Sequence, residues 1–192
     1  TIDGSTLSVN GSSSIGSGNG SETTVSLTNR ATITGTNAIN IAEGNNTHVE
    51  MTINDSSLTT EDILSIGLGD SSVVTVSGSK TTLSSKGDMI FGQGTGTTTG
   101  LTLSDLSSVT TQGVMSVAKG EGTIANVDMS GDSELSAVSL SIGEGKASDS
   151  TLYGNGATLT TQQEFAVAKG DGAHATLDYA NSTLTTGSAV IA

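Results

Sequence analysis

Aliphatic residues return along this chain at a nearly constant interval, separated by runs of Ser, Thr, Gly, Asn and Asp. The clearest landmark is a four-residue phrase in which an aliphatic or aromatic residue is followed by Gly or Ala, then any residue, then Gly. The phrase begins at Ile15, Ile41, Ile66, Phe91, Val117, Ile142 and Val167, and an eighth copy begins at Ile191. The first seven copies are 25 or 26 residues apart, which indicates a repeat architecture.

Three further apolar columns follow the same period. Two residues before the phrase stand Ile39, Leu64, Met89, Met115, Leu140 and Phe165. Seven residues after its last glycine stand Val25, Met51, Val76, Leu101, Val127, Leu152 and Leu177. The last column contains Leu7, Ile33, Leu58, Leu83, Val109, Leu135, Leu159 and Leu184. Because apolar residues within a unit lie two positions apart and turn-forming clusters separate the runs, each unit is predicted to contain three short strands.

Strands this short, with no helical stretch between them, can bury their apolar faces only by coiling and stacking on the next copy. The sequence therefore predicts an all-β fold, a right-handed single-stranded parallel β-helix (β-solenoid). Each turn would hold about 25 residues and three short strands, and the chain would make about 7–8 turns. Residues 1–192 are expected to form a single β-helix segment.

The glycines of the phrase are interpreted as corner residues, because a corner needs a residue that tolerates positive φ at the same place in every turn. No helix follows the phrase, so a phosphate-binding loop is not expected. Two kinds of departure are predicted to loosen the register locally. Ala replaces the first glycine at Ala42, Ala118, Ala168 and Ala192, and Gly78 and Gly154 interrupt an apolar column.

Composition narrows the possible functions. Hydrophobic residues are 33% of the chain but aromatic residues only 2%, so a thin core of stacked aliphatic side chains is expected. The absence of Cys removes disulfides, thiolate nucleophiles and the usual zinc sites. A formal net charge of -13 repels phosphate backbones, so nucleic acid is not an expected partner.

Candidate chemistry is sparse. His48 and His174 are expected in loops five turns apart, about 24 Å at the usual strand spacing, too far apart to share a metal ion. The carboxylates of Asp70, Glu144 and Asp171 follow no clustered pattern. No catalytic residue, cofactor or metal site is predicted, and the chain is not expected to be an enzyme. Lys119, Glu144 and Lys169 occupy the third position of successive phrases and are predicted to form an exposed ladder of alternating charge.

Hydroxyl residues flank the last apolar column on both sides. Because side chains alternate along a strand, these hydroxyls should all point away from the core on one face. We prefer the interpretation that Thr stacks well in strands, and keep as an alternative that the face is a flat interaction surface. The candidate residues for that surface are Thr32, Thr34, Thr59, Thr82, Thr110, Thr158, Thr160, Thr183 and Thr185.

With these columns in view, residues 64–87, 89–113 and 165–187 resemble the strand-and-turn repeats of type V secretion autotransporter passengers. The first of them reads LSIGLGDSSVVTVSGSKTTLSSKG. The resemblance covers essentially the whole chain and is specific for architecture rather than for one protein. It implies that the chain is a fragment of a passenger domain, without the signal peptide and the C-terminal β-barrel anchor that would carry it through the outer membrane.

Passengers of this kind include adhesins and self-associating aggregation factors. The expected function is therefore adhesion or self-association at the bacterial cell surface, with another copy of the chain, a host glycan or a matrix protein as the partner. Two alternatives remain. The repeated Thr-x-Thr face is similar to that of some ice-binding β-solenoids, and β-helices also carry carbohydrate-active enzymes.

Overall fold

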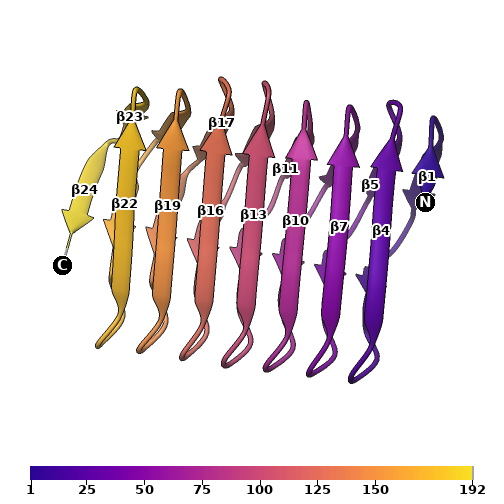
Figure 1. The fold of residues 1–192 in the computed structure, drawn as a ribbon, viewed down its shortest axis with the longest axis horizontal. Helices are drawn as coiled ribbons and strands as arrows, with labels where there is room; N and C mark the ends of the chain where they lie inside the picture. Colours follow the sequence, from indigo (N-terminus) through magenta and orange to yellow (C-terminus); the bar gives the residue numbers. More distant parts are fainter. Residues whose placement is uncertain (192) are drawn as a thin grey trace.

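The structure, a computed structural model, describes residues 1–191 and confirms the β-solenoid. Three parallel sheets of eight strands each run along the molecule, and each turn contributes one strand to every sheet. Figure 1 shows the turns side by side in sequence order, from β1 at one end of the rod to β24 at the other. No helix in the described residues has the length and apolar character needed to span a membrane.

We call the three sheets A, B and C. Sheet A consists of β1 (Ile2–Asp3), β4 (Glu22–Thr28), β7 (His48–Asn54), β10 (Val73–Ser79), β13 (Thr98–Ser104), β16 (Ile124–Ser130), β19 (Asp149–Asn155) and β22 (His174–Ala180). Sheet B consists of β2 (Thr6–Val9), β5 (Thr32–Gly35), β8 (Ser57–Thr60), β11 (Thr82–Ser85), β14 (Ser108–Thr111), β17 (Glu134–Ala137), β20 (Thr158–Thr161) and β23 (Thr183–Thr185). Sheet C consists of β3 (Ser13–Ile15), β6 (Ile39–Ile41), β9 (Leu64–Ile66), β12 (Met89–Phe91), β15 (Val114–Val117), β18 (Ser139–Ile142), β21 (Glu164–Val167) and β24 (Ser188–Ile191).

The predicted apolar columns are the core of the solenoid. In sheet B, Leu58, Leu83 and Val109 stand opposite one another in successive strands, and each is at most 1% exposed. Phe91 and Phe165 are the largest fully buried side chains. Leu7 and Leu184, in the first and last turns, are covered from one side only and remain 45% and 38% exposed. Stacking like on like lets small aliphatic side chains fill a narrow interior.

Buried hydroxyls accompany the aliphatic columns, which the sequence pattern did not predict. One column lies at the corner before sheet A and contains Thr47, Ser72, Thr97, Thr123 and Ser148, each at most 2% exposed. Thr47 Oγ1 donates to Ser72 Oγ at 2.9 Å, and Ser72 Oγ donates to the Gly44 carbonyl at 3.0 Å. Thr97 and Thr123 likewise donate to corner carbonyls, whereas the Ser148 hydroxyl has no partner among the described residues.

The two glycines of the repeated phrase serve different purposes. At the first glycine position the backbone is left-handed in every described copy, with φ of 75° at Gly67 and 58° at Ala42, so the positive-φ prediction is confirmed there. Because Ala adopts the same conformation, the alanines do not loosen the register. Ala192 lies outside the described residues. At the last glycine position the prediction is wrong, because the backbone there does not have a positive φ. Glycine is needed for a different reason, since a Cβ on Gly69 would clash with the Gly44 carbonyl of the preceding turn. That glycine allows close stacking of backbones.

Gly154 leaves a space in the core that the next turn fills. A Cβ at this position would collide with the ring of Tyr179, which stands opposite Gly154 in β22. Burial raises the pKa of the Tyr179 phenol to about 12. The glycine therefore does not loosen the register, which continues through Gly154 without a break.

Candidate functional site

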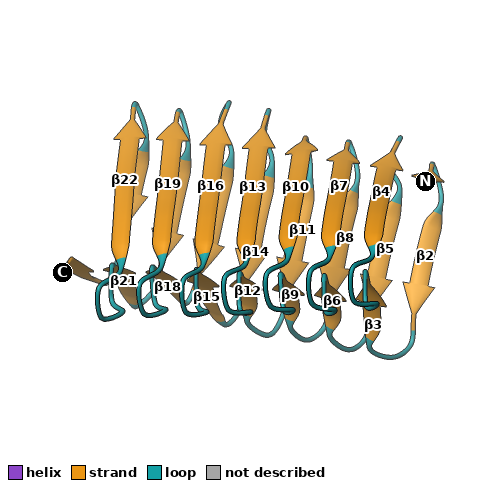
Figure 2. Cartoon of the chain, turned by 60° about the horizontal axis from the view of Figure 1, so that its bottom comes forward, coloured by secondary structure: helices purple, strands orange, loops and turns teal. Residues whose placement is uncertain are grey.

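The nine candidate threonines all lie on the outer face of sheet B, which we call the hydroxyl face. From β5 to β20 its strands alternate between a buried aliphatic residue and outward residues that are exposed or half-buried. The outward residues form two columns in register along the rod, as Thr32↔Ser57 and Thr34↔Thr59 illustrate. Figure 2 shows the strands of this sheet from β2 to β14 following one another along the rod. The prediction that these hydroxyls share a face is confirmed.

Many of these hydroxyls have hydrogen-bonding capacity to spare. Thr34 Oγ1 donates to Ser8 Oγ at 3.1 Å, and Ser57 Oγ donates to Thr32 Oγ1 at 3.3 Å. Within residues 1–191, the hydroxyls of Thr59 and Thr160 make no hydrogen bond to protein atoms. Each hydroxyl can donate one bond and accept two, so this face can bind water or a second surface. One carboxylate, that of Glu134, interrupts the first column.

The outer face of sheet A is broader and was not predicted from the sequence. Its strands from β4 onward have seven residues, compared with three or four in sheet B. Outward Ser and Thr also occur there, and Ser77 Oγ donates to Thr52 Oγ1 at 3.5 Å. In residues 73–79 every second residue is buried, and these are Val74, Val76 and Gly78. The alternation with Thr75 and Ser77 is visible in the sequence and could have indicated this outer face.

The histidines begin strands instead of lying in loops, which corrects the sequence-based expectation. His48 is the first residue of β7 and His174 the first residue of β22, because the strands of sheet A extend further toward the preceding corner than predicted. Each stands opposite a carboxylate residue, Glu22 and Asp149 respectively. In the described part of the chain, no group of three or more His, Asp and Glu side chains is placed to hold a metal ion.

The expected charge ladder holds only in part for Lys169, because the charge of Glu144 in the preceding turn acts on it but its direct ion-pair partner is another residue. Its Nζ atom bonds Glu164 Oε1 at 2.9 Å within the same turn. This hydrogen bond and the charge of Glu164 raise the pKa of Lys169, and the charge of Glu144 adds to the effect. An ion pair between neighbouring turns does occur elsewhere, between Lys86 and Glu61. Exposed pairs of this kind stabilise the register only slightly.

Asp70 has a structural role that its sequence position did not reveal. The Asn45 side chain accepts a hydrogen bond from the Asp70 backbone N-H at 2.9 Å. The Asp70 carboxylate in turn accepts one from the Thr95 N-H at 2.8 Å. The two side chains thus link corners of successive turns.

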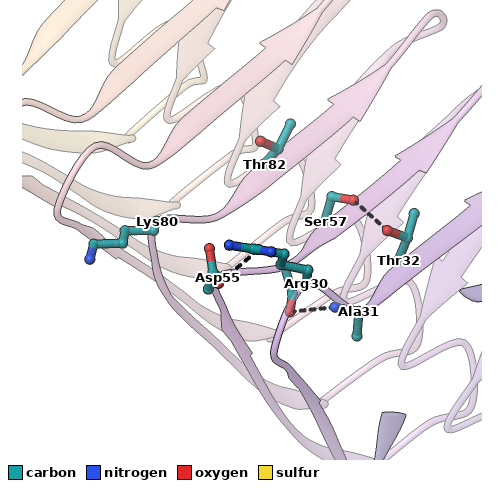
Figure 3. Close-up of a pocket in the computed structure, with 8 residues that line it drawn as sticks. Arg30, Ala31, Thr32, Asp55, Ser57, Lys80 and Thr82 are labelled. Carbon is teal, nitrogen blue, oxygen red and sulfur yellow. Dashed lines mark hydrogen bonds and ion pairs between the residues drawn. The ribbon is translucent and has the colours of Figure 1, made fainter. Parts of the chain in front are cut away.

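A shallow recess opens at the corner between sheets A and B and reaches the edge of the hydroxyl face, whose Thr32 and Thr82 form part of its lining. Its cavity volume is about 230 Å³. The polar lining comes from three successive turns and contains Arg30, Thr32, Asp55, Ser57, Lys80 and Thr82. Figure 3 shows the Arg30 side chain turned toward Asp55, whereas Lys80 lies on the other side of that carboxylate with its ammonium end pointing away from it.

Comparison with known proteins gives one partial match. No family model matches the chain, and no solved structure matches it. A stretch of 78 residues is 47% identical to a protein of Escherichia coli strain K12 described as uncharacterized protein YuaO. The match covers 41% of this chain, and it spans only 4% of the length of that relative.

Proposed function

We propose that this chain is a rod-like segment of a bacterial surface protein that mediates adhesion by self-association through the hydroxyl face. The observation that carries the proposal is the alignment of outward Ser and Thr in two columns over eight turns, of which the second is unbroken and the first is interrupted only by Glu134. The repeat resembles that of autotransporter passengers, and the bacterial relative is much longer than the matched stretch. Both observations support a place in an extended surface protein.

The physical basis is a large number of small, equivalent contacts. A hydroxyl that exchanges water for a partner hydrogen bond gains little, on the order of 1 kcal/mol or less. Contacts of this size become useful only when many form together, and a rigid rod presents them at a regular spacing. Neighbouring rungs are about 4.8 Å apart in every copy, so two faces that meet in antiparallel orientation keep the same spacing throughout.

Charge sets the conditions under which the faces can meet. The net charge of -13 opposes the approach of two copies. At physiological ionic strength this repulsion is screened beyond about 8 Å. Self-association should therefore strengthen from low to moderate salt, whereas an interface held together by salt bridges would weaken.

The test is sedimentation velocity across a salt series, for the original chain and for a Thr110, Thr160 and Thr185 triple substitution to Lys or to Glu. Both triple variants should associate less, because they place charges on the hydroxyl face, even though the Lys variant lowers the net negative charge. The matched control replaces Thr75, Thr102 and Thr151, on the outer face of sheet A, with Glu.

The control distinguishes an effect of charge on the hydroxyl face from an effect of the overall net charge. The control adds the same charge as the Glu variant and should retain association once salt screens the repulsion. A chain that stays monomeric in every salt, or a control that associates as poorly as the face variants, would contradict the proposal. Aggregation of cells that display the chain is the corresponding cellular measurement.

Ice binding is a second candidate, favoured by one observation. Thr32 and Thr34 in β5 and Thr158 and Thr160 in β20 form complete Thr-x-Thr strands on a regular face. Ser residues in several turns and Glu134 in β17 reduce that regularity. Thermal hysteresis of a concentrated solution distinguishes the candidates, since self-association alone produces no hysteresis.

A further inference from the structure

The recess between sheets A and B exists because corner lengths differ from turn to turn. Three residues separate β4 from β5, and three separate β13 from β14. Only two residues separate β7 from β8 and β10 from β11. The two short corners therefore lie between longer ones, and the extra residue in the β4–β5 corner brings Arg30 to the rim of the recess.

Two of the six basic residues of this strongly acidic chain meet at this recess. The closest approach of Arg30 to Asp55 is 3.9 Å, from Nε to Oδ2, and the side chains are 90% and 61% exposed. That separation is long for a charge-assisted hydrogen bond, so most guanidinium donors of Arg30 remain available. Lys80 forms no ion pair with any residue in 1–191. The three side chains together carry a net charge of about +1.

Hydroxyls continue this polar lining onto sheet B. Thr32, Ser57 and Thr82 stand in register on successive strands, about 4.8 Å apart. This spacing is close to the width of a pyranose ring. The recess thus brings the Arg30 guanidinium, the Asp55 carboxylate and a row of hydroxyls around one space, with the Lys80 side chain at its margin. That space is smaller than the usual 300–1,000 Å³ of a small-molecule pocket.

We infer that this recess binds one uronic acid residue of an acidic saccharide. Its carboxylate accepts hydrogen bonds from the guanidinium donors of Arg30 that Asp55 leaves free, and Lys80 adds positive charge on the other side of Asp55. Its ring hydroxyls donate to Asp55 and exchange hydrogen bonds with Ser57 and Thr82. Each contact is exposed, so a single site binds weakly, and several copies of the chain acting on one polymer provide the avidity. This inference does not depend on self-association through the hydroxyl face.

The experiment is an NMR titration of the ¹⁵N-labelled full chain at constant ionic strength, with sodium glucuronate, glucose and sodium acetate as probes. Glucuronate should shift the amides of residues 30–32, 55–57 and 80–82, and should bind more tightly than either other probe. The Arg30→Gln/Lys80→Gln variant should weaken glucuronate binding by roughly tenfold, as expected for two exposed charge contacts.

The matched control is Lys119→Gln/Lys146→Gln, which removes the same charge from the corner before sheet A and should leave binding unchanged. Equal affinity for acetate would mean simple anion capture, and equal affinity for glucose would mean that the cations take no part. Either result overturns the inference. An equal loss of binding in the control variant, or glucuronate shifts confined to other turns, also overturns it.

Discussion

The sharpest test of the fold is Leu83→Asp, in the centre of sheet B. Leu83 is 1% exposed and lies between Leu58 and Val109, so no polar group of the neighbouring strands faces its side chain. The substitution loses about 2–3 kcal/mol of apolar burial and adds several kcal/mol for a desolvated, unpaired carboxyl. A total above about 4 kcal/mol is a large fraction of the usual stability of a domain.

The solenoid geometry predicts where the damage appears. Each turn contacts mainly its neighbours, so the turns on either side of Leu83 should open first, and the melt should lose its single cooperative transition. Hydrogen exchange should show lost protection in β8, β11 and β14. The matched control is Ser84→Asp, one residue along the same strand and directed outward, which should change the stability by about 0.5 kcal/mol or less.

The pH dependence has a definite sign. Burial raises the pKa of the introduced carboxyl in the folded chain above its unfolded value near 3.9. The ionisation penalty is therefore full only above the folded pKa, shrinks as the pH falls from there, and is lost once the pH is below about 3.9, where the carboxyl is protonated in both states. Circular dichroism melts at neutral and acidic pH, each compared with Ser84→Asp, measure it. An unchanged melting temperature and unchanged exchange in Leu83→Asp would refute the assignment of this column to the core.

Three further outcomes are expected. Gly69→Ala should lower the melting temperature by several degrees, because its Cβ meets the Gly44 carbonyl, whereas Gly100→Ala, with nothing closer than 4.0 Å, should not. Titration followed by ultraviolet absorbance should show a phenol that ionises near pH 12 and disappears in Tyr179→Phe. Since its folded pKa is raised, stability should fall as the pH rises above about 10. EDTA should leave the melt unchanged, and a drop of more than a few degrees would reveal a metal site.

The sequence predicted the architecture well because the signal is repeated in every turn. Leu58, Leu83 and Val109 occupy one column at the repeat period, and aliphatic columns that lie two residues apart within each unit are typical of stacked strands. The hydroxyl face followed from the same alternation. Buried hydroxyls such as Ser72 were not predicted. Ser is common at corners, and the sequence alone does not show whether its side chain points inward or outward.

The recess was not predicted because it depends on the length of each corner between sheets A and B, and the length of a whole repeat does not give the length of one corner. A 26-residue step records that one residue has been added, but not at which corner it lies. In the unit with β16, the corner before β17 gains a residue and the connection after it loses one, so the step remains 25. The ion-pair partner of Lys169 was not predicted because Glu164 lies outside the repeated phrase. Glu164 begins β21, and Lys169 follows the end of the same strand.

The close stacking at the last glycine of each phrase affects how such a rod can change over generations. The same backbone contact with the preceding turn recurs at Gly44, Gly69, Gly94 and Gly120. Every turn therefore presents the same contact surface to the turn that follows it. Recombination that duplicates or deletes one whole unit would leave every junction intact and alter only the copy number. A deletion of a few residues inside a strand would instead shift all later columns by a fraction of a turn. Rod length can therefore drift in steps of one turn while the cross-section stays fixed, so reach from the surface can evolve separately from the chemistry of the faces.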